Sequence, residues 1–156
     1  MLCRVEAFLM LCVTSITILI TMNYFLLKTE PSEYSFDDLI RDKKTIWSGV
    51  SAAPALIHLR SMKKGDRAFI YHTGAEKQIV GIATIVSGPY PDAKLKNDKM
   101  VVVEIAAAEK LHHSVTLATV KNIPALAGMP LVRIGRLSVQ PVTKQEWDII
   151  ISLSQL

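Results

Sequence analysis

The feature that most constrains the fold is an uncharged stretch near the beginning of the chain. From Ala7 to Leu27 no residue is charged, and about 20 apolar residues are enough for a membrane-spanning helix. Residues 1–21 contain 15 apolar residues and only two charged ones. The remaining residues, 22–156, therefore have a composition closer to that of an ordinary globular domain.

Three interpretations of residues 1–21, which we call the leader, are open. As a signal peptide it is poor, because Arg4 is its only basic residue, Glu6 follows closely and no small-residue cleavage site ends the run. As a membrane anchor it reaches full length only by including residues 24–27, which suit a strand of the next domain. As an upstream extension it would precede a domain that starts at Met22. We expect the third interpretation, with a leader over 1–21 and one domain over 22–156.

Charge and cysteine content narrow the class of protein. The net charge of +4 and the pI of about 9.1 permit a polyanionic partner without requiring one. Cys3 and Cys12 both lie in the leader, so the domain has no disulfide scaffold, thiol nucleophile or cysteine zinc site. We expect a cytoplasmic protein, or a nuclear one in a eukaryote, with membrane anchoring by residues 1–21 as the alternative.

After Met22 the chain alternates short strands with short helices. Apolar and β-branched runs predict strands over 24–27, 67–73, 79–86, 100–106 and 137–142, and residues 88–92 suit a rigid loop. About five strands with short helices between them indicate an α+β domain built on a small, partly closed barrel. Helices are predicted after Ser35, over 54–59, after Thr116, at Pro124, and after the capping box Thr143–Glu146.

Known catalytic motifs are missing from the sequence, including the glycine-rich nucleotide loops, HExxH and GxSxG. His112 and His113 are adjacent, so on a regular strand they point to opposite faces and cannot share a metal; surface positions are expected. His58 is expected on a helix face. His72 ends a strand, where it either bonds a loop carbonyl or lines a binding site. No catalytic residue, metal or cofactor is predicted.

The two tryptophans lead to different expectations. Trp147 belongs to an amphipathic stripe and is predicted to lie in the core. Trp47 precedes the small-residue loop 48–51, where an indole has few neighbours. It is either a core residue or a platform on which a planar ligand stacks.

Nine short motifs follow one another in an order that resembles a known family. They are YFLLKTEP (24–31), YSFDDL (34–39), WSGV (47–50), LRSMKKGD (59–66), YHT (71–73), VGIA (80–83), YPD (90–92), PLVR (130–133) and RLSVQP (136–141). Together they are similar to the EVE domain family over residues 23–153. The leader has no counterpart in that family, which favours Met22 as the start of the domain.

The resemblance implies a PUA-like pseudo-barrel of about five to six strands with short flanking helices. It also implies a monomeric, non-enzymatic reader of a nucleic acid that carries a modified base, modified cytosine in DNA first of all, with no metal. A flipped base is held by an aromatic face and a few hydrogen bonds, and stacking contributes about 1–3 kcal/mol. The pocket residues implied by position are Trp47 as a wall, Lys28 and Thr29 at the mouth, Gly49 and Val50 in the loop where the backbone approaches the base, and Tyr71, His72, Thr73, Ser138 and Gln140 as polar contacts.

Three departures from the family pattern limit what the resemblance implies about the pocket and about the surface that meets the nucleic-acid backbone. Phe25 stands where the family commonly has Trp, and the loop between Tyr90 and Met100 is shorter than in longer members. The sequence from Trp47 to Ala52 is WSGVSA, where the family has WDGVRN, so three polar groups are lost from the pocket edge. An RNA-binding accessory module of an RNA-modification system is the alternative function, and a small-molecule or protein-interaction role is the third.

Overall fold

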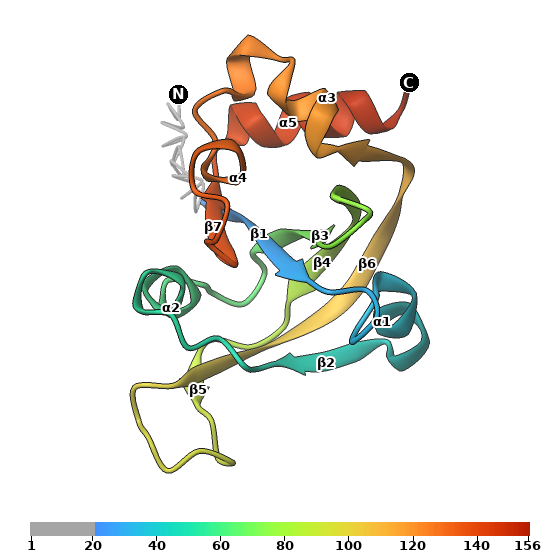
Figure 1. Ribbon diagram of the computed structural model, residues 1–156. Helices are drawn as coiled ribbons and strands as arrows, with labels where there is room; N and C mark the ends of the chain where they lie inside the picture. Colours follow the sequence, from blue (N-terminus) through green and yellow to red (C-terminus); the bar gives the residue numbers. More distant parts are fainter. Residues whose placement is uncertain (1–20) are drawn as a thin grey trace, which may run out of the picture.

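The structure is a computed structural model in which residues 21–156 are described (Figure 1). The predictions about residues 1–20 lie outside this range. Within it, none of the helices has the length and apolar character needed to cross a membrane.

A mixed, curled sheet forms the centre of the molecule (Figure 1). Its pairing order is β2-β6-β4-β3-β1-β7, with β5 paired to β6, so β2 and β7 are the two ends of an open sheet. β1 and β3 run parallel, and the other pairs are antiparallel. The strands are β1 (Tyr24–Thr29), β2 (Lys44–Trp47), β3 (Arg67–His72), β4 (Gln78–Ile85), β5 (Tyr90–Pro91), β6 (Val101–Thr116) and β7 (Val139–Val142).

Short helices begin where the sequence predicts caps. Ser35, Thr116 and Thr143 each accept a hydrogen bond from a backbone N–H of the first turn, and two of these caps are complete capping boxes. The helices are α1 (Phe36–Asp42), α2 (Ala53–Arg60), α3 (Leu117–Lys121), the 3-10 helix η1 (Pro124–Leu126), α4 (Pro130–Arg133) and α5 (Lys144–Ser154). The predicted caps and helix starts are confirmed.

The sheet has a hydrophobic core on each face. On β1, Phe25 and Leu27 join one core while Leu26 joins the other, as the period of two along a strand requires. Helices α1 and α2 contribute to the first core, and α3, η1, α4 and α5 contribute to the second. Because both faces are covered, β1 reads as a continuous apolar run rather than an alternating one.

The α+β class is confirmed, but the sheet has seven strands instead of five to six. β2 was not predicted, because it is a short edge strand in which only Trp47 is buried. Within the rigid loop expected over 88–92, Tyr90–Pro91 form the short strand β5 against β6. The strand predicted over 100–106 continues to Thr116, since its second half pairs with β4.

The histidine pair lies in an irregular part of β6. Ile79 faces Val115 while Gly81 faces Lys110, so the register shifts across residues 111–114. Both histidines are exposed, as predicted, but the ring centroids of His112 and His113 are 4.5 Å apart. The expectation that they point to opposite faces is wrong, because it assumed a regular strand.

Candidate functional site

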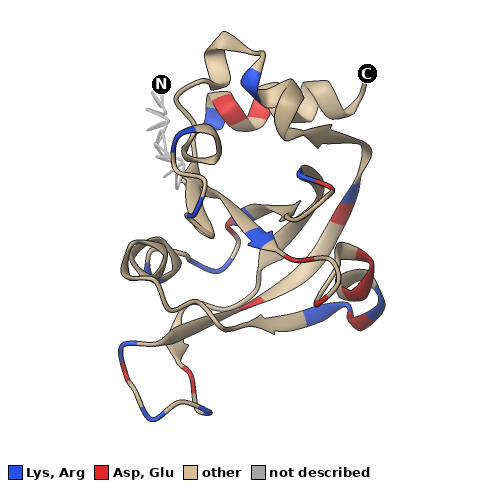
Figure 2. Cartoon of the chain, in the orientation of Figure 1, with Lys and Arg blue, Asp and Glu red and all other residues tan. Residues whose placement is uncertain are grey.

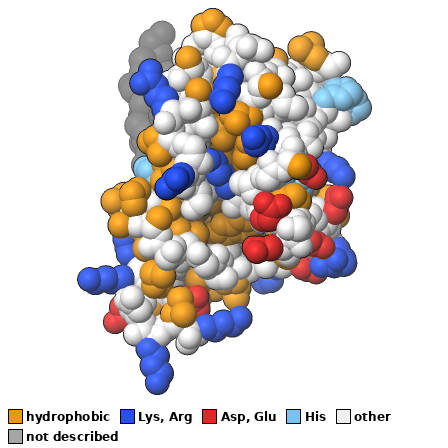
Figure 3. Space-filling model, viewed as in Figure 1, with side chains coloured by type: hydrophobic (Ala, Val, Ile, Leu, Met, Phe, Trp, Pro, Cys, Tyr) orange, Lys and Arg blue, Asp and Glu red, His pale blue; other side chains and the backbone are white. Residues whose placement is uncertain are grey.

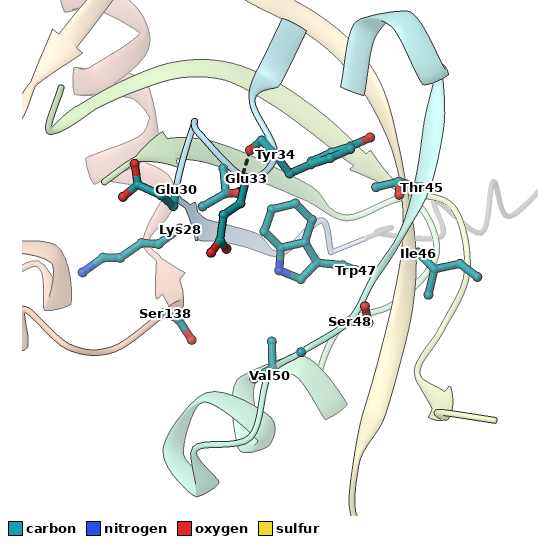
Figure 4. A pocket seen from close by; sticks show the side chains of 12 residues that line it. Lys28, Glu30, Glu33, Tyr34, Thr45, Ile46, Trp47, Ser48, Val50 and Ser138 are labelled. Atoms are coloured by element: carbon teal, nitrogen blue, oxygen red, sulfur yellow. Dashed lines mark hydrogen bonds between the residues drawn. The ribbon is translucent and has the colours of Figure 1, made fainter. Parts of the chain in front are cut away.

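A cavity of about 480 Å³ opens between the end of β1 and β2 (Figure 4). This volume falls in the range of pockets that take small molecules or single bases. Six of the ten residues implied by the sequence line it, and six further residues complete the wall. The lining residues are Lys28, Thr29, Glu30, Glu33, Tyr34, Thr45, Ile46, Trp47, Ser48, Gly49, Val50 and Ser138.

Trp47 lies at the middle of the cavity wall (Figure 4). It is the last residue of β2, and only 9% of its surface is exposed. The same side chain belongs to the core between the sheet and helices α1 and α2. Within residues 21–156 its indole N–H has no hydrogen-bond partner. Trp47 therefore packs in the core and also presents an aromatic surface to the cavity.

Two carboxylates stand beside this indole, and sequence reasoning did not single out either of them. Glu33 points its carboxylate toward the space in front of Trp47 (Figure 4), and no hydrogen bond holds that carboxylate within the described residues. Glu30 is held in place, because Thr73 Oγ1 donates to its Oε2 at 3.0 Å. The free carboxylate of Glu33 is thus the available acceptor in the cavity.

The loop that carries Glu33 is fixed at both ends. Thr29 Oγ1 donates to the carbonyl of Tyr34 at 2.7 Å (Figure 4), and the Tyr34 hydroxyl donates to Asp42 at 3.0 Å. Ser35 then begins α1 with its capping box. Burial is the main cause that raises the pKa of the Tyr34 hydroxyl. These bonds fix the backbone on both sides of Glu33 relative to β1 and α1.

Lys28 connects this cavity to a smaller one. Its Nζ donates to the carbonyl of Gly135 at 2.7 Å and lies 5.7 Å from the centroid of the Tyr71 ring. Burial lowers the pKa of this half-buried lysine. Tyr71 and Thr73, two of the residues implied by the sequence, line the neighbouring cavity of about 200 Å³ and not the main one. Lys28 lines both cavities.

His72 lies outside both cavities, although its position in the sequence implied a polar contact. The His72 side chain is buried, and its Nε2 accepts the backbone N–H of Phe36 at 3.0 Å. Its Nδ1 lies 2.6 Å from Glu76 Oε2. Since Nε2 is the acceptor, Nδ1 carries the ring hydrogen and donates a hydrogen bond to Glu76. His72 thus ties the beginning of α1 to the end of β3.

Gln140 also lies away from the cavities, on β7. It is fully buried, and its Nε2 donates to the carbonyl of Leu137 at 2.8 Å. Its Oε1 is the one buried side-chain polar atom without a partner in the described part of the chain. Ser138, just before β7 begins, does line the main cavity.

Gly49 occupies a conformation that few other residues adopt. Its φ is +81°, and a Cβ built there would have no neighbour within 4 Å. The glycine is thus required by the turn and not by crowding. Open space over this backbone leaves room for a planar group to approach the peptide plane next to Trp47.

The arrangement suits recognition of a small planar group. An aromatic wall, a free carboxylate and the hydroxyls of Ser48, Ser138 and Thr45 surround the cavity. Residues 21–156 contain no cluster of three or more side chains that could hold a metal ion. What the cavity offers is stacking and hydrogen bonding.

Comparison with known proteins agrees with the resemblance found in the sequence. The model of the EVE domain family matches residues 23–153. Thymocyte nuclear protein 1 of Rattus norvegicus is 32% identical over 167 residues, which cover 85% of this chain and 74% of the rat protein. A Rhodopseudomonas palustris protein solved by NMR is 43% identical with a TM-score of 0.83, covering 86% of this chain and 94% of that one. Human THYN1 protein, crystallised with DNA containing 5-methylcytosine, is 28% identical with a TM-score of 0.79, covering 86% and 98%.

Proposed function

This chain belongs to the EVE domain family, and we propose that it is a non-enzymatic reader that binds a modified cytosine of DNA in the cavity around Trp47. The complex of human THYN1 protein with DNA containing 5-methylcytosine supports this proposal for the family. For this chain, the observation that carries it is the free carboxylate of Glu33 beside the aromatic wall of Trp47.

Stacking and volume favour a single base as the ligand. The cavity of about 480 Å³ accommodates a nucleobase with part of its sugar. Stacking on an aromatic side chain contributes about 1–3 kcal/mol per base and does not depend on which base it is. Trp47 therefore supplies affinity, and the polar groups around it supply selectivity.

Glu33 favours cytosine over thymine. A carboxylate accepts a hydrogen bond from the N4 amino group of cytosine, whereas thymine presents the O4 acceptor at that position. This distinction matters because 5-methylcytosine and thymine share the methyl group at C5. Val50, on the opposite side of the cavity from Glu33 (Figure 4), offers an apolar contact for another edge of the base.

Binding to matched oligonucleotides tests the proposal. The oligonucleotides differ at one position, which is 5-methylcytosine, cytosine or thymine, and each is used single-stranded and as a duplex so that base-pairing costs are separated. We expect the highest affinity for 5-methylcytosine and, from one favourable polar contact of about 1–3 kcal/mol, about 5- to 150-fold weaker binding of thymine. The mass of each oligonucleotide should be unchanged after incubation.

Two results would contradict the proposal. Equal affinity for all three bases would mean that the cavity does not read the base, and a change of oligonucleotide mass would mean that the protein is an enzyme. An RNA of the same sequence with 5-methylcytidine tests the alternative. Tighter binding of this RNA than of the DNA would favour an RNA-binding accessory module.

A further inference from the structure

Charges of opposite sign lie on opposite sides of the main cavity. Basic side chains are grouped on β1, on the turn between β3 and β4, and on α4 with the segment that follows it (Figure 2). Acidic residues lie in the loop after β1 and on α1. In the space-filling view, blue side chains surround one side of the hollow and red ones border the other (Figure 3). We call Lys28, Lys77, Arg133 and Arg136 the basic rim.

Two residues of the basic rim, Lys28 and Lys77, line the smaller cavity. It has a volume of about 200 Å³ and shares Lys28 with the main cavity. Lys77 and Gly135 line it as well, and Gly135 stands directly before Arg136 in the chain. A group bound beside the main cavity on this side meets cationic side chains and the hydroxyl of Thr73.

No carboxylate pairs with the rim within the described residues, although the half-buried Nζ of Lys28 already donates to the carbonyl of Gly135. Within residues 21–156, the lysines and arginines that form ion pairs are Arg41, Lys110 and Lys144, none of which belongs to the rim. Arg133 uses only its Nε, toward the carbonyl of Ala127 at 3.3 Å. The carboxylate next to Lys77 in the chain, Glu76, is directed at His72.

We propose that the basic rim binds the phosphates that flank the recognised nucleotide, so that the nucleic-acid backbone crosses the α4 side of the cavity and avoids the α1 side. This inference rests on the proposed function. Phosphates are attracted by the rim and repelled by Glu30 and Glu33, which no lysine or arginine pairs within the described residues, whereas the acidic residues of α1 are paired with Arg41 and Lys110. An uncharged base avoids that repulsion and reaches the carboxylate of Glu33.

The number of rim residues sets the salt dependence. On duplex DNA each neutralised phosphate contributes about 0.9 to the slope of log affinity against log salt, so four contacts give a slope of about −3.6. A parent slope between about −3 and −4 is therefore expected. A slope near −10 would require a much more extensive basic surface than the rim and would contradict the proposal.

Neutralising the basic rim tests where the nucleic-acid backbone crosses the protein. The triple variant Lys77→Gln, Arg133→Gln, Arg136→Gln should lower the magnitude of the slope by about 0.9 per residue and weaken duplex binding by about fivefold to tenfold per residue at 0.1 M salt. The loss should be equal for DNA with 5-methylcytosine and with cytosine, because phosphate contacts carry no base information. All three side chains are exposed, and thermal unfolding checks that the variant is folded.

The matched control removes the same charge elsewhere. Lys94→Gln, Lys96→Gln and Lys99→Gln change three exposed lysines of the loop between β5 and β6, and they should leave the slope within about 0.5 of the parent value. Equal losses of salt slope and affinity in both triple variants would contradict the proposal that the basic rim binds the phosphates. A rim variant that loses selectivity but keeps its slope would also overturn it.

The outcomes separate this inference from the proposed function. If the parent binds DNA with 5-methylcytosine and with cytosine equally, and only the rim variant lowers the slope, phosphate binding by the basic rim is supported and recognition of the base is contradicted. If the parent prefers 5-methylcytosine and the rim variant behaves like the control, recognition of the base is supported and phosphate binding by the basic rim is contradicted. Absence of binding to either DNA overturns both.

Discussion

At the scale of single residues, Trp47 has two roles that compete in any substitution experiment. It contributes to the core, and it lines the cavity. Replacing it with alanine would remove both contributions at once. Comparing two smaller apolar side chains at this position, one aliphatic and one aromatic, separates them.

Trp47→Leu should weaken binding of the 5-methylcytosine oligonucleotide by about 1–3 kcal/mol, which is about 5- to 150-fold, because stacking is lost. Trp47→Phe keeps an aromatic face and should retain most of the affinity. Both side chains are smaller than indole, so both variants should melt below the parent, Trp47→Leu at least as far as Trp47→Phe. Calorimetric titration and thermal unfolding of the two variants measure these quantities.

Trp147 provides the control for a purely structural tryptophan. Its ring stacks on Phe69 at 3.8 Å between centroids and lies 4.5 Å from the ring of Tyr24, and it is 5% exposed. Trp147→Ala should cost about 3–5 kcal/mol of unfolding free energy. Equal binding by Trp47→Leu and Trp47→Phe would show that the aromatic face is not used.

The proposed reading of the base depends on Glu33. Glu33→Ala removes the free acceptor of the cavity, so the preference for 5-methylcytosine over thymine should shrink by about 1–3 kcal/mol. Since Glu33 is exposed, the free energy of unfolding should change by less than about 0.5 kcal/mol. Glu33→Gln retains an oxygen acceptor and should keep part of the preference. An unchanged preference in Glu33→Ala would assign base selection to other groups.

At the scale of elements, the position of α1 depends on one glycine of β4. A Cβ on Gly81 would lie 2.3 Å from two ring atoms of Phe36, the first residue of α1. Phe36 is 1% exposed, so its ring has little space into which to move. The absence of a side chain at Gly81 therefore lets helix and strand approach closely.

Gly81→Ala should destabilise the protein by about 1–3 kcal/mol, the cost of overpacking a filled core. Gly88→Ala is the matched control, because nothing lies within 4 Å of a Cβ built there and its φ is not in the left-handed region. Urea unfolding of both variants measures the difference. Equal stabilities would mean that α1 moves away from the sheet at no cost.

The capping box of α1 predicts a dependence on pH. Hydrogen bonds from the backbone N–H of Ser35 at 2.9 Å, from its hydroxyl, and the nearby Arg41 hold the pKa of Asp38 below its ordinary value of 3.8. A carboxyl whose pKa is lower in the folded state stabilises the protein above its ordinary pKa, and this contribution is lost as the pH falls through the folded value.

Unfolding free energies of the parent and of Asp38→Asn should therefore converge as the pH falls from about 5 to about 2. Urea unfolding at each pH measures the difference. A difference that is independent of pH would show that the charge of Asp38 does not contribute to the cap.

At the scale of the whole molecule, β1 is an interior strand of the sheet. It pairs with β3 on one side and with β7 on the other, and Leu26 and Leu27 are fully buried. Residues 24–27 extend the uncharged stretch to the length of a membrane span. In the folded domain these residues belong to the sheet and are unavailable for insertion into a bilayer.

A chain that begins at Met22 should therefore fold completely without detergent, because β1 supplies everything that the sheet requires from this end. Dispersion of amide proton signals and a single cooperative urea transition measure this. Folding only in the presence of detergent would show that the domain boundary at Met22 is wrong. The full chain, measured in parallel, shows what residues 1–21 add to stability.

The sequence alone determined the features that depend on neighbouring residues. Caps at Ser35, Thr116 and Thr143 follow from side chains that reach a backbone N–H three residues away. The apolar run of β1 and the stripe with Trp147 follow from burial of one or both faces of an element. Six of the ten residues that the resemblance implied line the main cavity: two at the end of β1, three between Trp47 and Val50, and Ser138.

Only the tertiary structure decided which elements meet, since pairing between distant segments leaves no local pattern. It added β2 and β5, extended β6 to Thr116, and placed His72 under Phe36, the first residue of α1. Glu33 lies in a polar turn where a glutamate is unremarkable by sequence. Its role becomes visible because β2 brings Trp47 beside it. Likewise, the basic rim gathers residues from segments more than 100 positions apart, and their charges act together because folding places them on one side of the cavity.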